Sequence, residues 1–259
     1  MITQQLSDPS AQRRNLARIT GAAGIIALVV VLGTSLANGY QSAAFTSDAE
    51  QVTTFFRSLD DWFGAFSAFL TSIGLIAMMW FAIGLALLLR RYDSELPWRS
   101  SFLAGAGILS VVSGQIASWD AAVFRSDEID PQVARYAFDL GNLSFANSWV
   151  ATGAMTLCAG LLIVSSRELP HWLGWWAILA GAGSVLARSV WTEGAAFIPF
   201  AVLWIWVAVI SMLLLAGRFA VASSVDPAGP YTHLRSQSPR CRTTPGGFRG
   251  HRPRSSSPP

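Results

Sequence analysis

Residues 63–89 read FGAFSAFLTSIGLIAMMWFAIGLALLL and contain no charged side chain. About 20 apolar residues in a helix cross the ~30 Å hydrocarbon core of a bilayer, so this stretch is long enough to span it with some tilt. Five further stretches of the chain have the same character. The six predicted spans are 19–37, 63–89, 101–119, 143–165, 171–191 and 195–217.

The spans are apolar on all faces and do not alternate with period two, which favours helices over a barrel. The sequence therefore predicts an all-α polytopic transmembrane bundle of six spanning helices at residues 19–219. A short cytoplasmic segment, 1–18, precedes it and a tail, 220–259, follows it. The alternative for the first span is a cleaved signal peptide, because Arg13 and Arg14 precede an apolar run that ends in Ser35-Leu36-Ala37.

The arginines indicate the orientation, because short cytoplasmic segments carry an excess of positive residues. The 18 Lys and Arg residues of the chain are all arginine. With both termini in the cytoplasm, the outer segments hold only Arg57, Arg125, Arg135 and Arg188, and the inner segments hold all the others. We therefore expect a multi-pass protein of a cell membrane with both termini cytoplasmic. The net charge of +3 then reflects topology and gives no reason to expect a nucleic-acid partner.

The tail at 220–259 has a different composition from the spans. Ser, Pro, Arg and Gly dominate residues 236–259, so the tail cannot bury enough apolar surface to offset its ordering entropy, and we expect disorder. Contact of its arginines with anionic lipid at the cytoplasmic face is one interpretation. A solvated tail without a specific partner is the other. The six arginines concerned are Arg235, Arg240, Arg242, Arg249, Arg252 and Arg254.

The two longer outer loops each predict a short amphipathic helix on the membrane surface or folded over the bundle. In the first, Ser47 and Glu50 form a capping-box pattern before apolar residues at i, i+3, i+4 and i+7. In the second, Asp130 is the predicted cap, Pro131 suits the first turn and Gly141 ends the helix. The two predicted apolar faces are Val52, Phe55, Phe56 and Leu59, and Val133, Tyr136, Ala137 and Leu140.

These loops belong to a longer similarity between residues 48–120 and 130–193. Each copy contains a span, an inner Glu-Leu-Pro turn with Pro97 or Pro170, and a Leu-Ala-Gly-Ala-Gly string at 103–107 or 179–183. Both copies run in the same direction through the membrane, which predicts a parallel repeat of two hairpins. Chance similarity within a biased composition is the alternative.

Polar groups at membrane depth are costly, so they are the first candidates for a functional site. The sequence offers an outer polar cluster of Gln115, Asp120, Asn147, Arg188 and Glu193. One interpretation is an outward-facing pocket. The other is that Arg188 extends to the outer surface and bonds to Asp120 or Glu193, while the two amides join helices.

No sequence motif predicts a catalytic residue, a metal site or a cofactor. The three histidines are scattered, and phosphate-binding loops and nucleophile elbows are missing from the sequence, which argues against an enzyme. Cys158 is expected to be a small packing residue. Most of the 11 tryptophans, including Trp149, lie near predicted span ends and fit an aromatic belt, whereas Trp204 and Trp206 lie deeper.

Three stretches resemble a group of small six-span bacterial integral membrane proteins described as a domain of unknown function. They are the acid-capped outer helix with Phe55-Phe56, the segment from Ala134-Arg135 to Asp139-Leu140-Gly141, and Leu169-Pro170-His171-Trp172-Leu173-Gly174-Trp175. The resemblance covers about residues 15–218. It implies a fold and a bacterial membrane location, and it implies no activity, substrate or site residue.

Two functions are consistent with these features. The first is a non-enzymatic membrane protein of unknown role that acts through helix–helix or lipid contacts. The alternative is a small permease or carrier for a neutral or weakly polar solute. A cavity that approaches the membrane midplane would favour the carrier, because transporters bind their substrates there. The sequence gives neither the ligand nor the oligomeric state.

Overall fold

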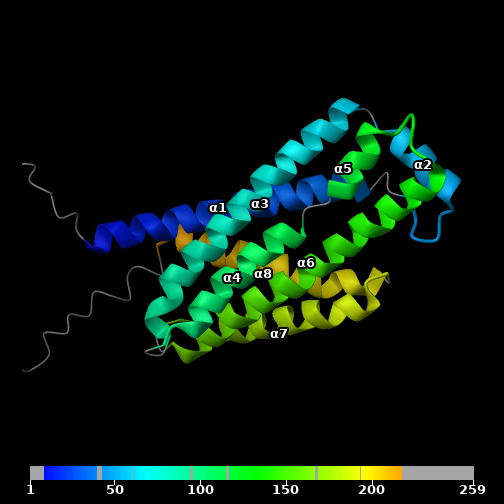
Figure 1. The fold of residues 1–259 in the computed structure, drawn as a ribbon. Helices are drawn as coiled ribbons and strands as arrows, with labels where there is room; N and C mark the ends of the chain where they lie inside the picture. Colours follow the sequence, from blue (N-terminus) through cyan, green and yellow to red (C-terminus); the bar gives the residue numbers. More distant parts are fainter. Residues whose placement is uncertain are drawn as a thin grey trace, which may run out of the picture. The chain divides into compact units, whose positions relative to one another are not determined.

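The computed structural model describes residues 9–39, 43–59, 61–93, 96–114, 117–166, 169–192 and 194–217. The chain divides into two units, Met1–Ala222 and Ser223–Pro259, and the predicted tail lies outside the described residues. Within the described ranges the regular structure is helical (Figure 1). The α-helices are α1 (Pro9–Gly39), α2 (Ala49–Arg57), α3 (Asp61–Leu89), α4 (Trp98–Ser113), α5 (Ala117–Phe124), α6 (Pro131–Ser165), α7 (His171–Ala187) and α8 (Phe197–Leu215).

Among the described residues, six helical segments are long and apolar enough to cross a membrane, which confirms the predicted all-α bundle. They are Ser10–Thr34, Gly64–Tyr92, Trp98–Phe124, Pro131–Ser165, His171–Val190 and Gly194–Leu215. The third segment differs from the single helix predicted at 101–119. It consists of α4, which ends at Ser113 before Gly114, and the separate short helix α5.

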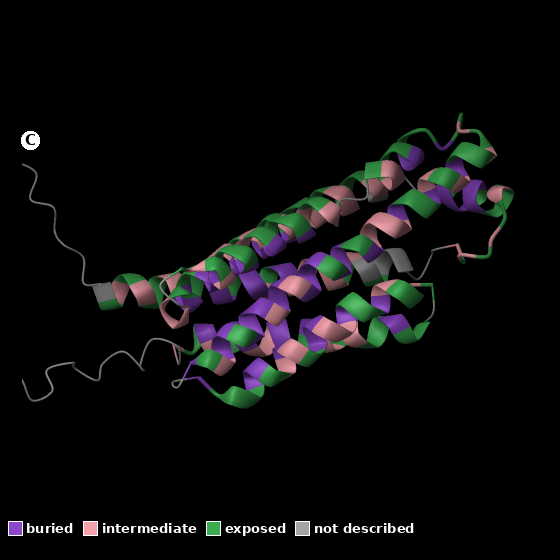
Figure 2. Ribbon diagram, turned by 60° about the horizontal axis from the view of Figure 1, so that its bottom comes forward, coloured by how far each residue is buried: buried purple, intermediate pink, exposed green. Residues whose placement is uncertain are grey.

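The six spanning helices close into a ring in chain order. α1 packs against α3, α3 against α4, α4 against α6, α6 against α7, α7 against α8, and α8 against α1. α6 also contacts α3 and α8, and 67% of its most apolar stretch is buried, against 33% for α1. Figure 2 shows the buried faces of the helices turned toward one another and the exposed faces turned outward, as expected for helices that face lipid.

Small residues permit close contacts between helices in this ring. A Cβ atom added to Gly181 of α7 would lie 2.5 Å from the carbonyl oxygen of Gly153 in α6. About two turns further along α6, a Cβ atom on Gly160 would lie 2.6 Å from the carbonyl oxygen of Gly174 in α7. Side chains at these positions would push the backbones apart, so the glycines permit α6 and α7 to pack closely.

We call the end of the bundle that carries the Pro97 and Pro170 turns the proline end, and the opposite end the α2 end. Each proline occupies the position just before its helix, α4 or α7, as the repeat predicts. At the proline end a buried carboxylate, Asp93, accepts hydrogen bonds from Arg99 Nε at 3.0 Å and from the backbone N–H of Ser100 at 2.8 Å. These bonds fix the start of α4.

The buried faces of α4 and α7 follow the same spacing, although superposition of the two hairpins stays a prediction. Gly107 and Gly181, which are 74 residues apart, both lie on the buried face. Alignment of the Leu-Ala-Gly-Ala-Gly strings at 103–107 and 179–183 matches Gly107 with Gly183 instead. At a separation of 74 residues the buried set Ser100, Leu103, Ala106, Gly107 and Ser110 matches Gly174, Ala177, Ala180, Gly181 and Ser184.

The first outer helix is present as α2, with its cap one residue later than predicted. Asp48 accepts from the backbone N–H of Gln51 at 2.8 Å, and the Gln51 side chain accepts from the Asp48 N–H, which completes the capping box. Ser47 and Glu50 are therefore not the capping pair. Phe55 and Phe56 of the predicted apolar face are buried against α5 and α6, so α2 folds over the bundle.

The second outer helix was wrongly predicted to be a separate element. Asp130 caps it as expected, but the helix continues through Gly141 and forms the first turns of α6. The predicted apolar face was also wrong, because Val133, Tyr136 and Leu140 are exposed while Ala134 and Phe138 are buried. This segment carries apolar residues on more than one helical face. The face with Ala134 and Phe138 is the one buried, because it contacts α2 and α5.

Candidate ligand cavity

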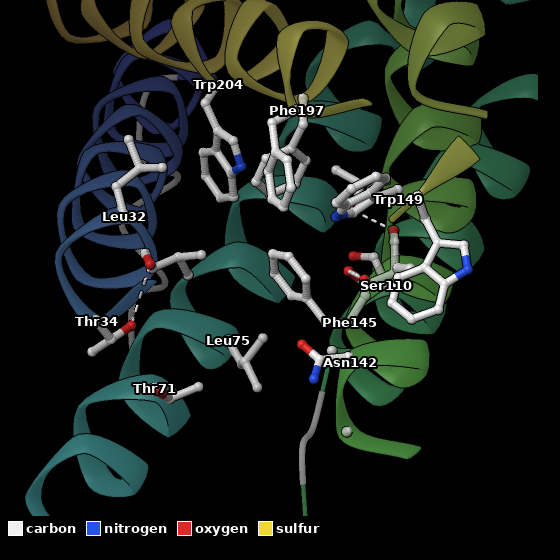
Figure 3. A pocket seen from close by; sticks show the side chains of 18 of the residues that line it. Leu32, Thr34, Thr71, Leu75, Ser110, Asn142, Phe145, Trp149, Phe197 and Trp204 are labelled. Carbon is white, nitrogen blue, oxygen red and sulfur yellow. Dashed lines mark hydrogen bonds between the residues drawn. The ribbon is translucent and has the colours of Figure 1, made fainter. Parts of the chain in front are cut away.

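A cavity of about 500 Å³ lies inside the ring, toward the α2 end. Its walls come from α1, α3, α4, α6 and α8, and its rim carries Phe45, Trp119 and Trp191. Figure 3 shows Leu32, Leu75 and Phe145 among the side chains that surround it. Ligand pockets in proteins typically measure ~300–1,000 Å³, so this cavity can hold a molecule of several rings.

One wall of the cavity is an aromatic cluster from α6 and α8. Trp149 stacks on Phe200 with 5.5 Å between ring centroids, and Phe200 meets Trp204 edge-on at 6.0 Å. Phe145 and Phe197 contact Trp149 edge-on at 5.7 and 5.2 Å. Edge-to-face pairs add to the stability that burial provides, so these contacts help to hold the wall together. The opposite wall is mainly aliphatic and comes from α1 and α3.

The cavity ends near the middle of the bundle. The lining residues nearest the proline end include Met78, Thr152 and Trp204, each 11 to 13 residues from the proline-end terminus of its helix. At 1.5 Å per residue this is roughly 17–20 Å, slightly more than half of a ~30 Å hydrocarbon core. Beyond that level the interior is filled by side chains such as Leu89 and Leu162, which are fully buried.

The hydroxyl groups around the cavity mostly bond to their own helices. Thr152 Oγ1 donates to Ser148 O at 2.8 Å, and Ser148 Oγ donates to Phe145 O at 2.6 Å. Ser110 Oγ donates to Gly107 O at 2.8 Å. Their protons are therefore used, and these oxygens can only accept further bonds.

The indole groups differ from the hydroxyl groups. Trp149 and Trp204 are 1% and 4% exposed, and within the described part of the chain neither Nε1 atom has a hydrogen-bond partner. Two other indoles are paired. The buried Trp206 donates to Leu173 O at 3.0 Å, and the partly exposed Trp119 of the rim donates to Phe138 O at 3.3 Å. An unsatisfied buried donor costs ~1–3 kcal/mol, so two of them beside one cavity require an explanation.

Three residues of the predicted outer polar cluster lie within the described ranges, and the cluster itself stays a prediction. Arg188 Nε donates to Asn147 Oδ1 at 2.9 Å, which brings these two residues together. Asp120 is exposed on α5, and no ion pair joins it to Arg188 among the described residues. Gln115 and Glu193 lie outside those residues, so a bond from Arg188 to Glu193 stays a prediction.

Asn147 lies apart from the cavity. It borders an apolar groove of about 580 Å³ between α4 and α6, where Phe102 and Leu109 are exposed. Neither Asn147, Arg188 nor Asp120 lines the cavity. Among the described residues of the predicted cluster, the bond from Arg188 to Asn147 supports an interhelical role for Asn147.

The sequence prediction missed the aromatic cavity. Phe197, Phe200 and Trp204 follow one another at i, i+3 and i+7, and Phe145 and Trp149 at i, i+4, which places each set on one helical face. This spacing was a usable signal. Trp149 was instead assigned to the interfacial belt, whereas it is buried, and the position of one aromatic face opposite the other cannot be derived from periodicity.

Metal-binding and thiol chemistry receive no support from the described residues. Within those ranges no three His, Cys, Asp or Glu side chains gather at a spacing suited to a metal ion. Cys158 is a buried free thiol on α6. No protein-family model, curated protein or solved structure matches the chain, so the cavity itself is the main guide to function.

Proposed function

We propose that this integral membrane protein binds a neutral, weakly polar molecule in its cavity, as the binding step of a small carrier. The observation that supports this proposal is the cavity of about 500 Å³ with an aromatic wall inside a ring of six spanning helices. The resemblance to six-span bacterial proteins adds an expected location but no ligand.

The lining of the cavity indicates the class of solute. Among the described residues that line it, none carries a charged side chain, and most surfaces are aromatic or aliphatic. An ion would be poorly compensated there, because burying a charge without a partner is very costly. A sugar or amino acid would leave several of its polar groups unpaired, so a mostly apolar solute is favoured.

The depth of the cavity is consistent with a carrier open toward the α2 end. Under the predicted orientation that end faces the outside, and the filled proline end faces the cytoplasm. Release on the other side would require the packed proline half to open, as in alternating access. Action through helix–helix or lipid contacts alone is the competing function, and it requires no ligand in the cavity.

Binding can be tested with the full-length chain in lipid nanodiscs and the neutral fluorophore 1-aminoanthracene. We expect a saturable fluorescence component above that of empty nanodiscs. Ala201 is an exposed alanine that lines the cavity, so Ala201→Phe should abolish this component. Ala22→Phe is the matched control, since Ala22 is exposed on α1 and does not line the cavity.

A second cavity-filling variant, Ala146→Leu, separates lost binding from lost folding, because Ala146 is a buried lining residue on another helix. Size-exclusion profiles of all variants should match the wild type. Absence of a saturable component in the wild type, or its survival in both filled variants, would contradict the carrier proposal and leave the contact function.

The orientation requires its own test. We propose that both termini are cytoplasmic, so the proline end should face the cytoplasm. In a cysteine-free background, Leu96→Cys should be shielded from a membrane-impermeant thiol reagent in intact cells, and Asp127→Cys should be labelled. Both positions are exposed at opposite ends of the bundle. The reverse labelling pattern would invert the orientation.

A further inference from the structure

The two unpaired indoles indicate what the ligand must offer. Trp149 and Trp204 both line the cavity, both are buried, and both contact Phe200. An indole nitrogen can only donate a hydrogen bond. The surrounding hydroxyls of Ser148 and Thr152 donate to the backbone, so their protons are not available to a ligand in this arrangement.

Resting on the proposed function, we infer that the cavity takes a neutral apolar molecule with carbonyl-type oxygens, which accept the N–H groups of Trp149 and Trp204. Ketones, quinones and esters belong to this class. They supply acceptors without donors, and they carry no charge into a lining without charged side chains. Both nitrogens are buried beneath the lining, so the inference requires the two rings to shift before a bound oxygen can reach them.

Two other indoles of the described residues contrast with this pair. Trp206 and Trp119 find backbone carbonyls at 3.0 and 3.3 Å, so the fold pairs indoles where the protein provides an acceptor. The unpaired pair occurs on the cavity wall, where a ligand can supply one. Polar groups nearer the α2 end, Asn142 and Thr71, line the same cavity and can contact a second polar group of the ligand.

The test compares two probes of nearly the same shape, 9,10-anthraquinone and 9,10-dimethylanthracene. Each displaces 1-aminoanthracene from the full-length protein in nanodiscs, and each affinity is expressed relative to that probe's partition into empty nanodiscs. We expect the quinone to bind about tenfold more tightly, since only its oxygens accept the indole protons.

The variants Trp149→Phe and Trp204→Phe keep an aromatic ring and remove the donor. Each should reduce the quinone preference by several-fold and leave the binding of dimethylanthracene unchanged. Trp80→Phe is the control, because Trp80 is 60% exposed and does not line the cavity. It should keep the full preference.

The outcomes separate this inference from the proposed function. Equal binding of the two probes by the wild type, or a preference that survives in the Trp149→Phe and Trp204→Phe variants, overturns the inference and leaves a purely apolar binding site. A bound water that already satisfies the indoles would give that result. If the wild-type protein showed no saturable 1-aminoanthracene binding, the proposed function itself would be contradicted.

Discussion

The proline half and the α2 half of the bundle are built from the same six helices but differ in how their interiors are filled. In the proline half, leucines such as Leu89, Leu103 and Leu162 are fully buried. In the α2 half, large aromatic rings stand on the wall of a cavity of about 500 Å³. The difference shows that the six helices can pack into a closed ring without filling the space inside it along its whole length.

Local backbone features explain where the two halves diverge. α4 ends at Ser113, and in the α2 half the short helix α5 packs against α6, α3 and α2. In the proline half α4 and α7 are anchored by their proline turns, and glycines bring α7 close to α6. The proline half should therefore carry most of the stability.

Leucine truncation should give the largest difference between the halves. Leu162→Ala removes a fully buried side chain from the proline half and should lower the free energy of unfolding by ~2–5 kcal/mol. Leu75→Ala enlarges a space that already exists beside Leu75, so it should cost only ~1 kcal/mol. Thermal unfolding in detergent measures both, and equal losses would contradict the difference in filling.

Replacing a glycine by alanine should destabilise the protein where helices are in close contact and should not do so where the glycine faces open space. A Cβ atom on Gly181 would meet Gly153 O at 2.5 Å, so Gly181→Ala should destabilise by ~1–3 kcal/mol. Gly33 of α1 has no atom within 4 Å of such a Cβ, and Gly33→Ala should stabilise by up to ~1 kcal/mol. Opposite signs in the two melting shifts are the expected result; a harmless Gly181→Ala would show that α6 and α7 can separate freely.

The ion pairs of the two ends should differ in the same direction. Asp93 is buried at the proline end and accepts from Arg99 and the Ser100 N–H, so Asp93→Asn should cost ~1–3 kcal/mol. Asp139 pairs with Arg135 on the exposed surface of α6, and Asp139→Asn should cost at most ~1 kcal/mol. High salt screens surface charges, so it should reduce the cost of Asp139→Asn and leave the cost of Asp93→Asn nearly unchanged.

The fold was largely predictable from the sequence because its main determinant is local. Long uncharged stretches specify the spans, and Asp130-Pro131 specifies where α6 starts. Gly141 was misleading because an isolated glycine also occurs inside a helix at a cost of ~1 kcal/mol. Two adjacent capping residues, Ser47 and Asp48, made the start of α2 ambiguous by one residue.

The cavity could not be predicted because it depends on relations between helices. Periodicity places Phe145 and Trp149 on one face of α6, and Phe200 on one face of α8, but it does not state that these faces meet. Polar residues attracted the site prediction, since they are the usual functional residues of membrane spans. In this chain the described polar residues of the predicted cluster lie outside the cavity.

The smallest expected effect concerns Arg188. It bonds to Asn147 between η2 (Arg188–Val190) and α6, so a double-mutant cycle of Arg188→Leu with Asn147→Ala should give a coupling of ~1 kcal/mol in unfolding free energy. The cycle with Asp120→Asn should give none, because no bond joins Asp120 to Arg188 among the described residues. A cycle with Glu193→Gln tests the remaining part of the predicted cluster, and a coupling near zero there would reduce the cluster to one hydrogen bond.

None of these Arg188, Asn147, Asp120 and Glu193 variants should alter 1-aminoanthracene binding, since the Asn147 groove and the cavity have separate linings. A loss of binding in Arg188→Leu would show that the two are linked and would weaken the separation of the site from the polar cluster.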